Sequence, residues 1–584
     1  MTVLAVKAGL LAALLLAGTA AAQPIQLLPR PITPAAPAAE AAPAEEEKKS
    51  VDPGPVAVQA LKPPDPSNVG TLDEGSGGLA PDLWNGSDRL VIERLVAMLP
   101  APSWGASTRA LQRRLLLSAS RVPDGQQVAP SLIGLRVERL AAMGLAADAQ
   151  ALAKLAPSTL LDANLARGAT DADWLAGDTK PGCERTDAWV RQDQDPYWLK
   201  ASLYCRVAAG DTAAANLALT LLREQNIDDA GYMALAAVLL NQPGAKVDTL
   251  KQPSPLQLAM LRSSRKLPPP DSIAGTAPGV LAGIAQGGLG EIELRLAAGE
   301  AAEAAGSLPS AQLARLYASV PFTNEERQNP AATLAKLADS PLRATALQVQ
   351  VATAKTVPVA RAEALKRLWT QSASRGIHAT LARTTLPLTQ SLTPSEEFSF
   401  AAADIVRALL AAGDMKSAQA WWVYIRSKPA DIDKAAADAA VAVWPLMLLA
   451  DSTASSPFDP VAWRRWNETQ KDVTDTVRAT RGAALLLFAE ALGYTVPPAA
   501  FADTIIAPAE GEAPPAVVRR TMPLAAEAGR KGETVLLALV SAGAAGPAKA
   551  DLYTLAAAAA ALRKTGFEVD ARAIAVEAAL ARGL

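Results

Sequence analysis

The segment 181–222 sets the tightest limit on the fold of this chain, because it encodes two short helices and a turn. Asp195 followed by Pro196 is typical of a helix start, since the carboxylate can cap free amides and proline fits the first helical position. Gly210 then ends this helix and turns the chain. Apolar residues recur at helical spacing after the turn, at Ala215, Leu219 and Leu222. The segment therefore predicts two antiparallel helices joined as an αα-hairpin.

A related sequence pattern recurs along the chain: a glycine is followed five residues later by an alanine. Glycine supplies the turn, and the small alanine lets the second helix approach the first closely. The copies begin at Gly144, Gly210, Gly413 and Gly566, with a weaker copy at Gly299. This pattern resembles the turn and second helix of a tetratricopeptide repeat (TPR). The resemblance implies an all-α fold, an α-solenoid of TPR-like helical hairpins.

The composition agrees with a helical chain. Runs of alternating β-branched and aromatic residues, which would signal strands, do not appear. Alanine and leucine dominate instead, and both favour helix. The whole chain resembles the alanine-rich secreted proteins of unknown function found in alphaproteobacteria, and that resemblance implies a bacterial envelope or secreted location.

The first 22 residues have the pattern of a secretory signal peptide. Lys7 supplies the positive start, residues 8–17 form a short apolar core, and cleavage is predicted between Ala22 and Gln23. The core is shorter than a membrane span needs. We therefore expect a periplasmic or secreted protein with no stable membrane span after cleavage, the alternative being an uncleaved anchor.

Shifts in composition divide the rest of the chain. Residues 23–75 are rich in proline, alanine and charge, which predicts a disordered linker or tether. Proline-rich stretches then interrupt helical stretches. We predict an N-terminal helical-hairpin region over 76–262, a Pro-rich loop or joint over 263–280, a second helical-hairpin region over 281–506, a linker over 507–516, and C-terminal helical hairpins over 517–584.

Cys183 and Cys205 are the two cysteines of the chain. In an oxidising compartment they are expected to form a disulfide, the alternative being two buried thiols. Cys183 is placed before the helix that begins near Asp195, so the bridge requires the chain to fold back. Closing a loop of about 21 residues contributes about 3 kcal/mol in the chain-entropy description.

No constellation of residues points to a particular chemistry. The single histidine, His378, excludes multi-histidine metal sites and is expected to lie on the surface or in packing. We expect no cofactor, no metal and no catalytic residue. Four tryptophans at helical spacing are interpreted as core residues, with a ligand platform as the alternative: Trp421, Trp422, Trp463 and Trp466. A net charge of −2 and 20% charged residues argue against nucleic acid as a partner.

These features lead to three functional hypotheses. The first is a non-enzymatic periplasmic scaffold or protein-binding α-solenoid that takes another envelope protein or a peptide as partner, since a concave solenoid surface suits such recognition. The second is a cell-wall-active enzyme with a helical superhelix, and the third is a small-molecule binder that uses the tryptophans.

Overall fold

The computed structural model describes residues 65–102, 105–126, 129–227, 229–288, 290–451, 457–509 and 511–584. Within these ranges every regular element is helical, and the pairing of extended backbone is limited to isolated bridges. The prediction of an all-α fold is confirmed. The signal peptide, its cleavage position at Ala22 and Gln23, and the linker as far as residue 64 lie outside the described residues.

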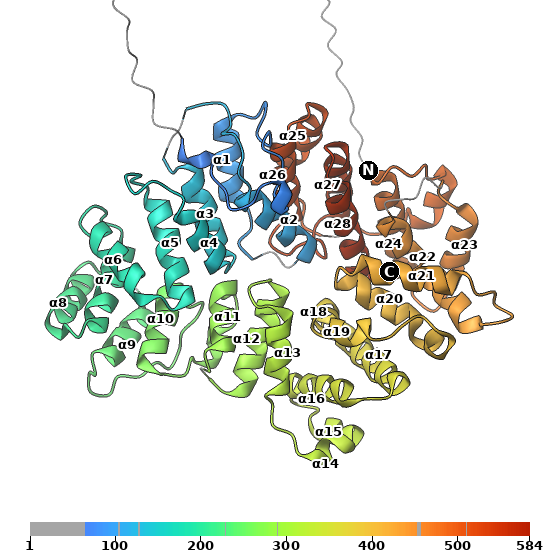
Figure 1. Cartoon of the computed structure of the whole chain (residues 1–584), viewed down its shortest axis with the longest axis horizontal. Coiled ribbons are helices and arrows are strands. Elements are labelled where there is room, and N and C mark those ends of the chain that lie inside the picture. The colour runs from blue at the N-terminus through green and yellow to red at the C-terminus, as the bar shows by residue number, and fades with distance from the viewer. Residues whose placement is uncertain are drawn as a thin grey trace, which may run out of the picture. The chain divides into compact units, whose positions relative to one another are not determined.

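The described residues belong to one compact unit of α-helices joined by turns and loops (Figure 1). The first helices are α1 (Arg89–Met98), α2 (Ala106–Leu117), α3 (Leu132–Ala142), α4 (Ala146–Ala153), α5 (Ala163–Ala176), α6 (Thr179–Trp189), α7 (Pro196–Ala208), α8 (Thr212–Glu224), α9 (Ala230–Leu239) and α10 (Pro255–Ser264). The next are α11 (Pro278–Gln286), α12 (Ile292–Ala304), α13 (Ser310–Ala318), α14 (Asn324–Gln328), α15 (Pro330–Lys336), α16 (Pro341–Ala354), α17 (Pro358–Ser374), α18 (His378–Thr384) and α19 (Leu386–Gln390). The last are α20 (Ala402–Ala411), α21 (Met415–Arg426), α22 (Lys434–Ala450), α23 (Pro460–Thr469), α24 (Asp475–Ala491), α25 (Ala516–Glu527), α26 (Lys531–Ala542), α27 (Leu552–Lys564) and α28 (Glu568–Ala581).

Four helix pairs turn at the glycines that the sequence singles out. Gly144, Gly210, Gly413 and Gly566 have φ values of 79°, 78°, 78° and 92°. They join α3 to α4, α7 to α8, α20 to α21 and α27 to α28, and the helices of each pair pack together. The alanine five residues after each glycine is fully buried: Ala149, Ala215, Ala418 and Ala571. A left-handed turn and a small side chain at the crossing thus allow each hairpin to close.

The weaker copy at Gly299 is wrong as a turn. Gly299 lies inside α12, with side chains of α13 close to it. The chain turns instead at Gly306, where φ is 79°. A helical glycine here serves close packing, since an added Cβ would lie 2.8 Å from a methyl carbon of Leu316.

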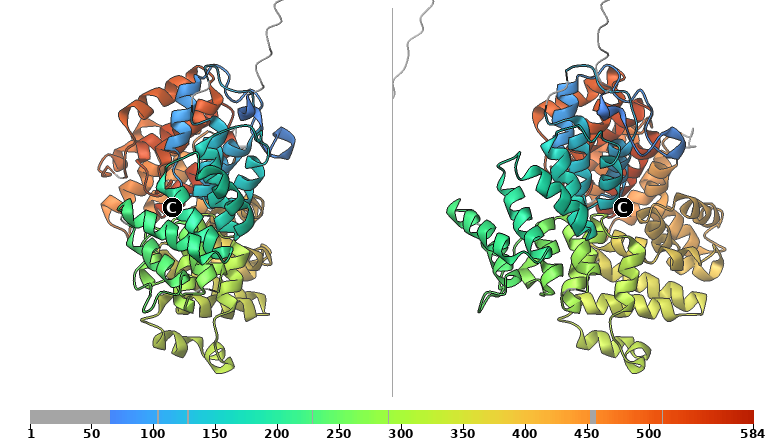
Figure 2. Two further views of the ribbon diagram at one scale, coloured as in Figure 1. Left: turned by 90° about the vertical axis from the view of Figure 1, so that its left-hand side faces the viewer. Right: turned by 60° about the vertical axis from the view of Figure 1, so that its left-hand side comes forward.

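The first and last helices of the described chain pack against one another. α1 contacts α26, and α2 contacts both α26 and α28 (Figures 1 and 2). Arg114 of α2 pairs with Asp570 of α28 at 2.9 Å. Gly105 precedes α2 and offers no capping side chain, so the Glu577 carboxylate of α28 accepts the amides of Ala106 and Ser107, at 2.6 and 2.9 Å. The end of the chain therefore caps a helix near its beginning.

Residues 65–76, which comprise the end of the predicted linker and the residue after it, hold two 3₁₀ turns against the helices, at Pro66–Asn68 and Glu74–Ser76. Arg136 of α3 fixes this edge. Its guanidinium donates to the carbonyls of Ser67, Val69, Leu116 and Ser118, over 2.7–3.2 Å. Burial lowers the pKa of Arg136 to about 10, so the group remains charged at neutral pH. The folded part of the chain thus includes residues before 76.

The Pro-rich joint predicted over 263–280 is packed. It runs from the end of α10 to the start of α11 and contains a 3₁₀ turn, Pro270–Ser272. Pro268 and Pro269 are buried, and the Asp271 carboxylate accepts the amide of Leu250 at 3.0 Å. The described part of the predicted linker 507–516 leads into α25.

Two buried ion pairs connect α12 to the α17–α18 region. Glu303 receives two hydrogen bonds from the Arg383 guanidinium, at 2.7 and 2.8 Å, and only 2% of its side chain is exposed. Glu300 pairs with Arg375 at 2.6 Å and also accepts the hydroxyl of Tyr317. Each buried carboxylate is therefore paired and hydrogen-bonded.

No helix among the described residues has the length and apolarity needed to cross a bilayer.

Candidate functional site

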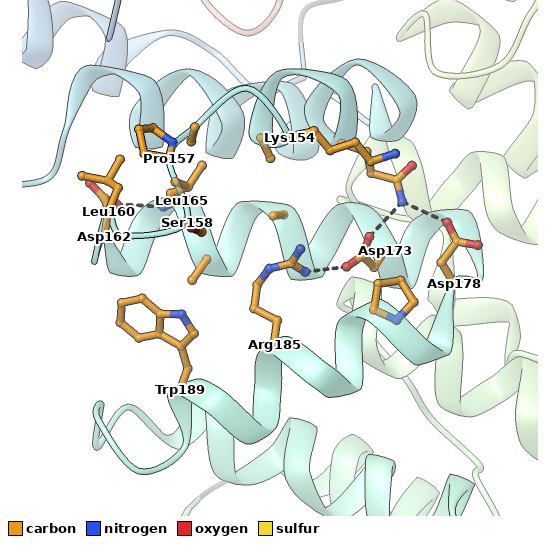
Figure 3. Close-up of a pocket in the computed structure, with 16 residues that line it drawn as sticks. Lys154, Pro157, Ser158, Leu160, Asp162, Leu165, Asp173, Asp178, Arg185 and Trp189 are labelled. Carbon is orange, nitrogen blue, oxygen red and sulfur yellow. Dashed lines mark hydrogen bonds and ion pairs between the residues drawn. The ribbon is translucent and has the colours of Figure 1, made fainter. Parts of the chain in front are cut away.

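A pocket of about 400 Å³ lies between α4, α5 and α6 (Figure 3). Helix α6 contributes one face to it, because Pro181, Arg185 and Trp189 follow one another at four-residue spacing. Helix α5 forms the floor and the α4–α5 connection forms the opposite rim. The pocket is thus assembled from consecutive helices of one region.

One end of the pocket is apolar. Trp189 lies across from Leu160 and Leu165 in Figure 3. Its ring is held from behind by a stack on Trp198, with centroids 5.8 Å apart and planes 19° from parallel. Leu161, next to the lining Leu160, is 74% exposed. An aromatic wall opposite two leucines, with an exposed leucine next to them in sequence, is typical of a surface that binds an apolar group.

The other end is charged. Arg185 of α6 pairs with Asp173 of α5 at 2.5 Å, and the Gln150 amide donates to Asp173 at 2.8 Å and to Asp178 at 3.0 Å (Figure 3). The carboxylate of Asp173 therefore has both oxygens occupied. These contacts fix the geometry of the polar end before any ligand arrives.

Asp162 is part of the lining but has a structural role. Its two oxygens accept the amide of Leu165, at 2.8 Å, and that of Ser131, at 2.7 Å. The first bond caps α5 and the second ties the start of α3 to it. This carboxylate positions the floor of the pocket.

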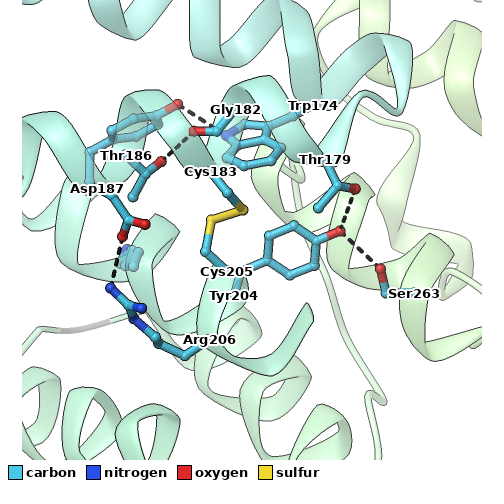
Figure 4. Close-up of a disulfide and its surroundings, with 12 residues drawn as sticks. Trp174, Thr179, Gly182, Cys183, Thr186, Asp187, Tyr204, Cys205, Arg206 and Ser263 are labelled. Carbon is cyan, nitrogen blue, oxygen red and sulfur yellow. Dashed lines mark hydrogen bonds and ion pairs between the residues drawn. A yellow bond between two sulfur atoms is a disulfide. The ribbon is translucent and has the colours of Figure 1, made fainter. Parts of the chain in front are cut away.

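The predicted disulfide is present and supports the α6 wall from the other side (Figure 4). Cys183 of α6 and Cys205 of α7 are bridged, with their Cα atoms 5.5 Å apart. Cys183 lies within a helix, whereas the sequence placed it before one. Helix α6 buries only Gly182 and Thr186, and a Cβ on Gly182 would meet the Trp174 ring at 2.7 Å. With so little apolar burial, α6 depends on the covalent link and on polar contacts for its position.

Replacing both cysteines with serine is expected to lower the free energy of unfolding by about 3 kcal/mol in the chain-entropy description. Because α6 has little other burial, loss of the disulfide should also make its amides exchange hydrogen faster than in the wild type. The increase should be larger for α6 than for α8. Urea unfolding and hydrogen-exchange mass spectrometry of the Cys183→Ser/Cys205→Ser variant measure both effects. Equal exchange of α6 in the variant and the wild type would contradict this account.

Asp171 is a buried carboxyl with the raised pKa that an enzymatic acid would need, but it does not line the pocket. It accepts the Tyr197 hydroxyl at 2.8 Å, and burial raises its pKa to about 6. Tyr197 in turn accepts the indole N–H of Trp174 at 3.2 Å and lies under Arg167. Asp171 and Trp174 of α5 are thus both hydrogen-bonded to the Tyr197 hydroxyl of α7, which links the two helices.

The raised pKa of Asp171 predicts a pH-dependent stability. The folded protein holds this proton more tightly than the unfolded chain, so stability falls as pH rises from about 4 to above 6. Asp171→Asn keeps an acceptor for Tyr197 and is expected to be more stable than wild type at about pH 7, with the difference vanishing near pH 4. Urea midpoints across this range measure it, with the exposed Asp438→Asn as control. A constant difference at all pH values would contradict the assignment.

The remaining singled-out residues lie away from the pocket. His378 begins α18, and burial lowers its pKa. Trp421, Trp463 and Trp466 are buried in the core, and Trp422 packs partly buried beside them, which agrees with core packing. Among the described residues no group of three or more His, Cys, Asp or Glu side chains is placed to hold a metal ion.

Sequence reasoning missed the pocket because it missed α6. The stretch 179–189 is polar and contains Pro181 and Gly182, which argue against helix. The available signal was the four-residue spacing of Pro181, Arg185 and Trp189. No protein-family model matches the chain, and no curated protein or solved structure matches it either.

Proposed function

We propose that this chain is a non-enzymatic periplasmic scaffold, an α-solenoid of TPR-like hairpins that binds a segment of another envelope protein. The pocket between α4, α5 and α6 carries the proposal. It combines an aromatic wall, apolar side chains opposite that wall and prearranged polar groups, and such combinations are typical of protein-binding hot spots.

Three further features support this function. The two helices of each hairpin pack together and close on a buried alanine, as they do in helical repeat proteins that bind partners. The pocket's most buried carboxylate, Asp173, is tied up by Arg185 and Gln150, so it serves geometry rather than proton transfer. The apolar leader and the disulfide fit an oxidising compartment.

The test is site-specific photo-crosslinking in intact cells. A photoreactive residue is introduced at the exposed Leu161, between the pocket-lining Leu160 and Asp162 in sequence, and, as matched control, at Val569 on α28, which is 76% exposed. We expect a reproducible adduct with one envelope protein from Leu161 and none from Val569. Adducts of the same kind from both positions, or from neither, would overturn the assignment of the binding surface.

A further inference from the structure

The pocket between α4, α5 and α6 is elongated, because its lining follows two antiparallel helices. On α6 the lining extends from Asp178, just before the first turn, to Trp189 at the last position, and on α5 it extends from Asp162 to Asp173. The ends of each range are eleven residues apart in sequence, which corresponds to about 16 Å along a helix. The apolar end and the polar end therefore lie at opposite ends of a groove (Figure 3).

An extended polypeptide fits a groove of this length and volume. A strand advances about 3.3 Å per residue, so about five residues span about 16 Å. An extended main chain about 5 Å across occupies about 400 Å³ over that length, which equals the volume of the pocket. A helix about 10 Å wide would need about three times as much space. Between Leu165 and Asp173 the floor of the groove is formed by Ala166 and Ala169, whose short side chains leave room for a main chain.

The polar end of the groove offers both an acceptor and a donor. Oδ2 of Asp178 accepts the Gln150 amide at 3.0 Å, and Oδ1 accepts no hydrogen bond from a described residue. The Arg185 guanidinium donates one N–H to Asp173, and its other N–H groups donate to no described residue. Because these two side chains have opposite charges, a charged ligand group here gains one attraction and suffers one repulsion. A main chain is neutral and carries an N–H and a C=O at each residue, so it satisfies both.

We propose that the groove binds an extended segment of about five residues from the partner protein. A large apolar side chain at one end of the segment packs between Trp189 and the two leucines, Leu160 and Leu165. The main chain then passes over the floor, and its far peptide groups donate an N–H to Asp178 and accept an N–H from Arg185. The anchor side chain selects the segment and the main-chain contacts add affinity. This deepens the proposed function, on which it rests, by naming the conformation and chemistry of the partner segment.

The length of the groove is tested with uncharged capped peptides and calorimetry of the full chain. The probes are capped phenylalanine, capped Phe-Ala-Ala, and two capped pentapeptides, Phe-Ala-Ala-Ala-Ala and Ala-Ala-Ala-Ala-Phe, which cover both chain directions. We expect one pentapeptide to bind about tenfold more tightly than capped phenylalanine, which is the effect of two further hydrogen bonds, and the tripeptide to gain little. Capped pentaalanine, which lacks the anchor, should bind about tenfold more weakly than that pentapeptide. Equal affinities for the one-residue and five-residue probes, or no binding of either pentapeptide, would overturn the proposal.

Two variants separate the anchor from the main-chain contacts. Trp189→Ala should weaken every probe that contains phenylalanine about tenfold or more. Asp178→Ala should weaken the pentapeptide about tenfold and leave capped phenylalanine unchanged, because only the longer chain reaches this end. Asp178 is exposed and its side chain caps no amide of α6, so the fold is not at risk. Asp438→Ala, at an exposed position of α22, is the matched control and should bind every probe as the wild type does. Wild-type affinity for the pentapeptide in the Trp189 or Asp178 variant would overturn the proposal.

The outcome is separable from that of the proposed function. If the chain binds its partner through this face by other chemistry, the Leu161 adduct forms while neither pentapeptide binds more tightly than capped phenylalanine. If the partner surface lies elsewhere, the Leu161 adduct is absent.

Discussion

Replacing Arg136 with methionine is expected to lower the free energy of unfolding by about 4 kcal/mol or more. The guanidinium is buried and donates to four backbone carbonyls, those of Ser67, Val69, Leu116 and Ser118. Methionine fills much of the same volume but donates nothing, so four acceptors lose their donor inside the protein. The loss should also favour release of residues 65–75, which two of these bonds hold together with the Asp65–Arg89 ion pair and backbone bonds to Leu117.

Equilibrium urea unfolding followed by circular dichroism measures the effect, and limited proteolysis detects the release of residues 65–75. Arg121→Met is the control, because Arg121 is exposed and lies close in sequence to the same carbonyls. The control should stay within about 0.5 kcal/mol of wild type. Arg136→Lys should be intermediate, since an ammonium has three donors and lacks the planar fork. Coincident unfolding curves for Arg136→Met and Arg121→Met would contradict the role given to Arg136.

Arg383→Met is expected to cost about 3–5 kcal/mol, because it leaves the buried Glu303 carboxylate without the guanidinium that donates two hydrogen bonds to it. The two-hydrogen-bond geometry at 2.7 and 2.8 Å is the strong form of such pairs. Removing both charges in Glu303→Leu/Arg383→Met should cost less than Arg383→Met alone, since the buried charge that Arg383 neutralises is then removed as well.

A double-mutant cycle over these two positions measures the coupling free energy. The control pair is Lys434 and Asp438, which are exposed on α22 and four residues apart. Its coupling should be about 0.5 kcal/mol or less. A coupling at Glu303–Arg383 no larger than that of the control pair would show that the buried pair does not hold α12 to α18.

The local features of the fold could be predicted from the sequence because their causes are local. Asp195 caps α7 through the Tyr197 amide, at 2.8 Å, as the Asp195–Pro196 pair predicts. The prediction of a turn at Gly299 was wrong because a glycine followed five residues later by an alanine can occur both within a helix and at its end. The packing of α13 against Gly299 distinguishes the two cases, and it is not visible in the local sequence.

The candidate site could not be predicted in the same way. Trp189, Leu160 and Asp173 come together only when α4, α5 and α6 pack, and packing is not visible in the spacing of any one segment. Arg136 shows the same limit. Its four carbonyl acceptors lie in segments up to 69 residues away in sequence. The residues around Arg136 therefore show only the pattern of an ordinary amphipathic helix.

Because Glu577 caps α2, the folding of the amino-terminal helices can be completed only after the carboxyl-terminal helix has been synthesised. The amides of residues 106 and 107 are synthesised first and their acceptor 470 residues later or more. The entropy of closing so long a loop grows only with the logarithm of its length, so the distance costs little stability. The large sequence separation slows folding instead, because contacts this far apart in sequence form late. The amino-terminal helices thus acquire their final neighbours only after the last helix has been made, and any chain cut short before α28 lacks the residue that completes α2.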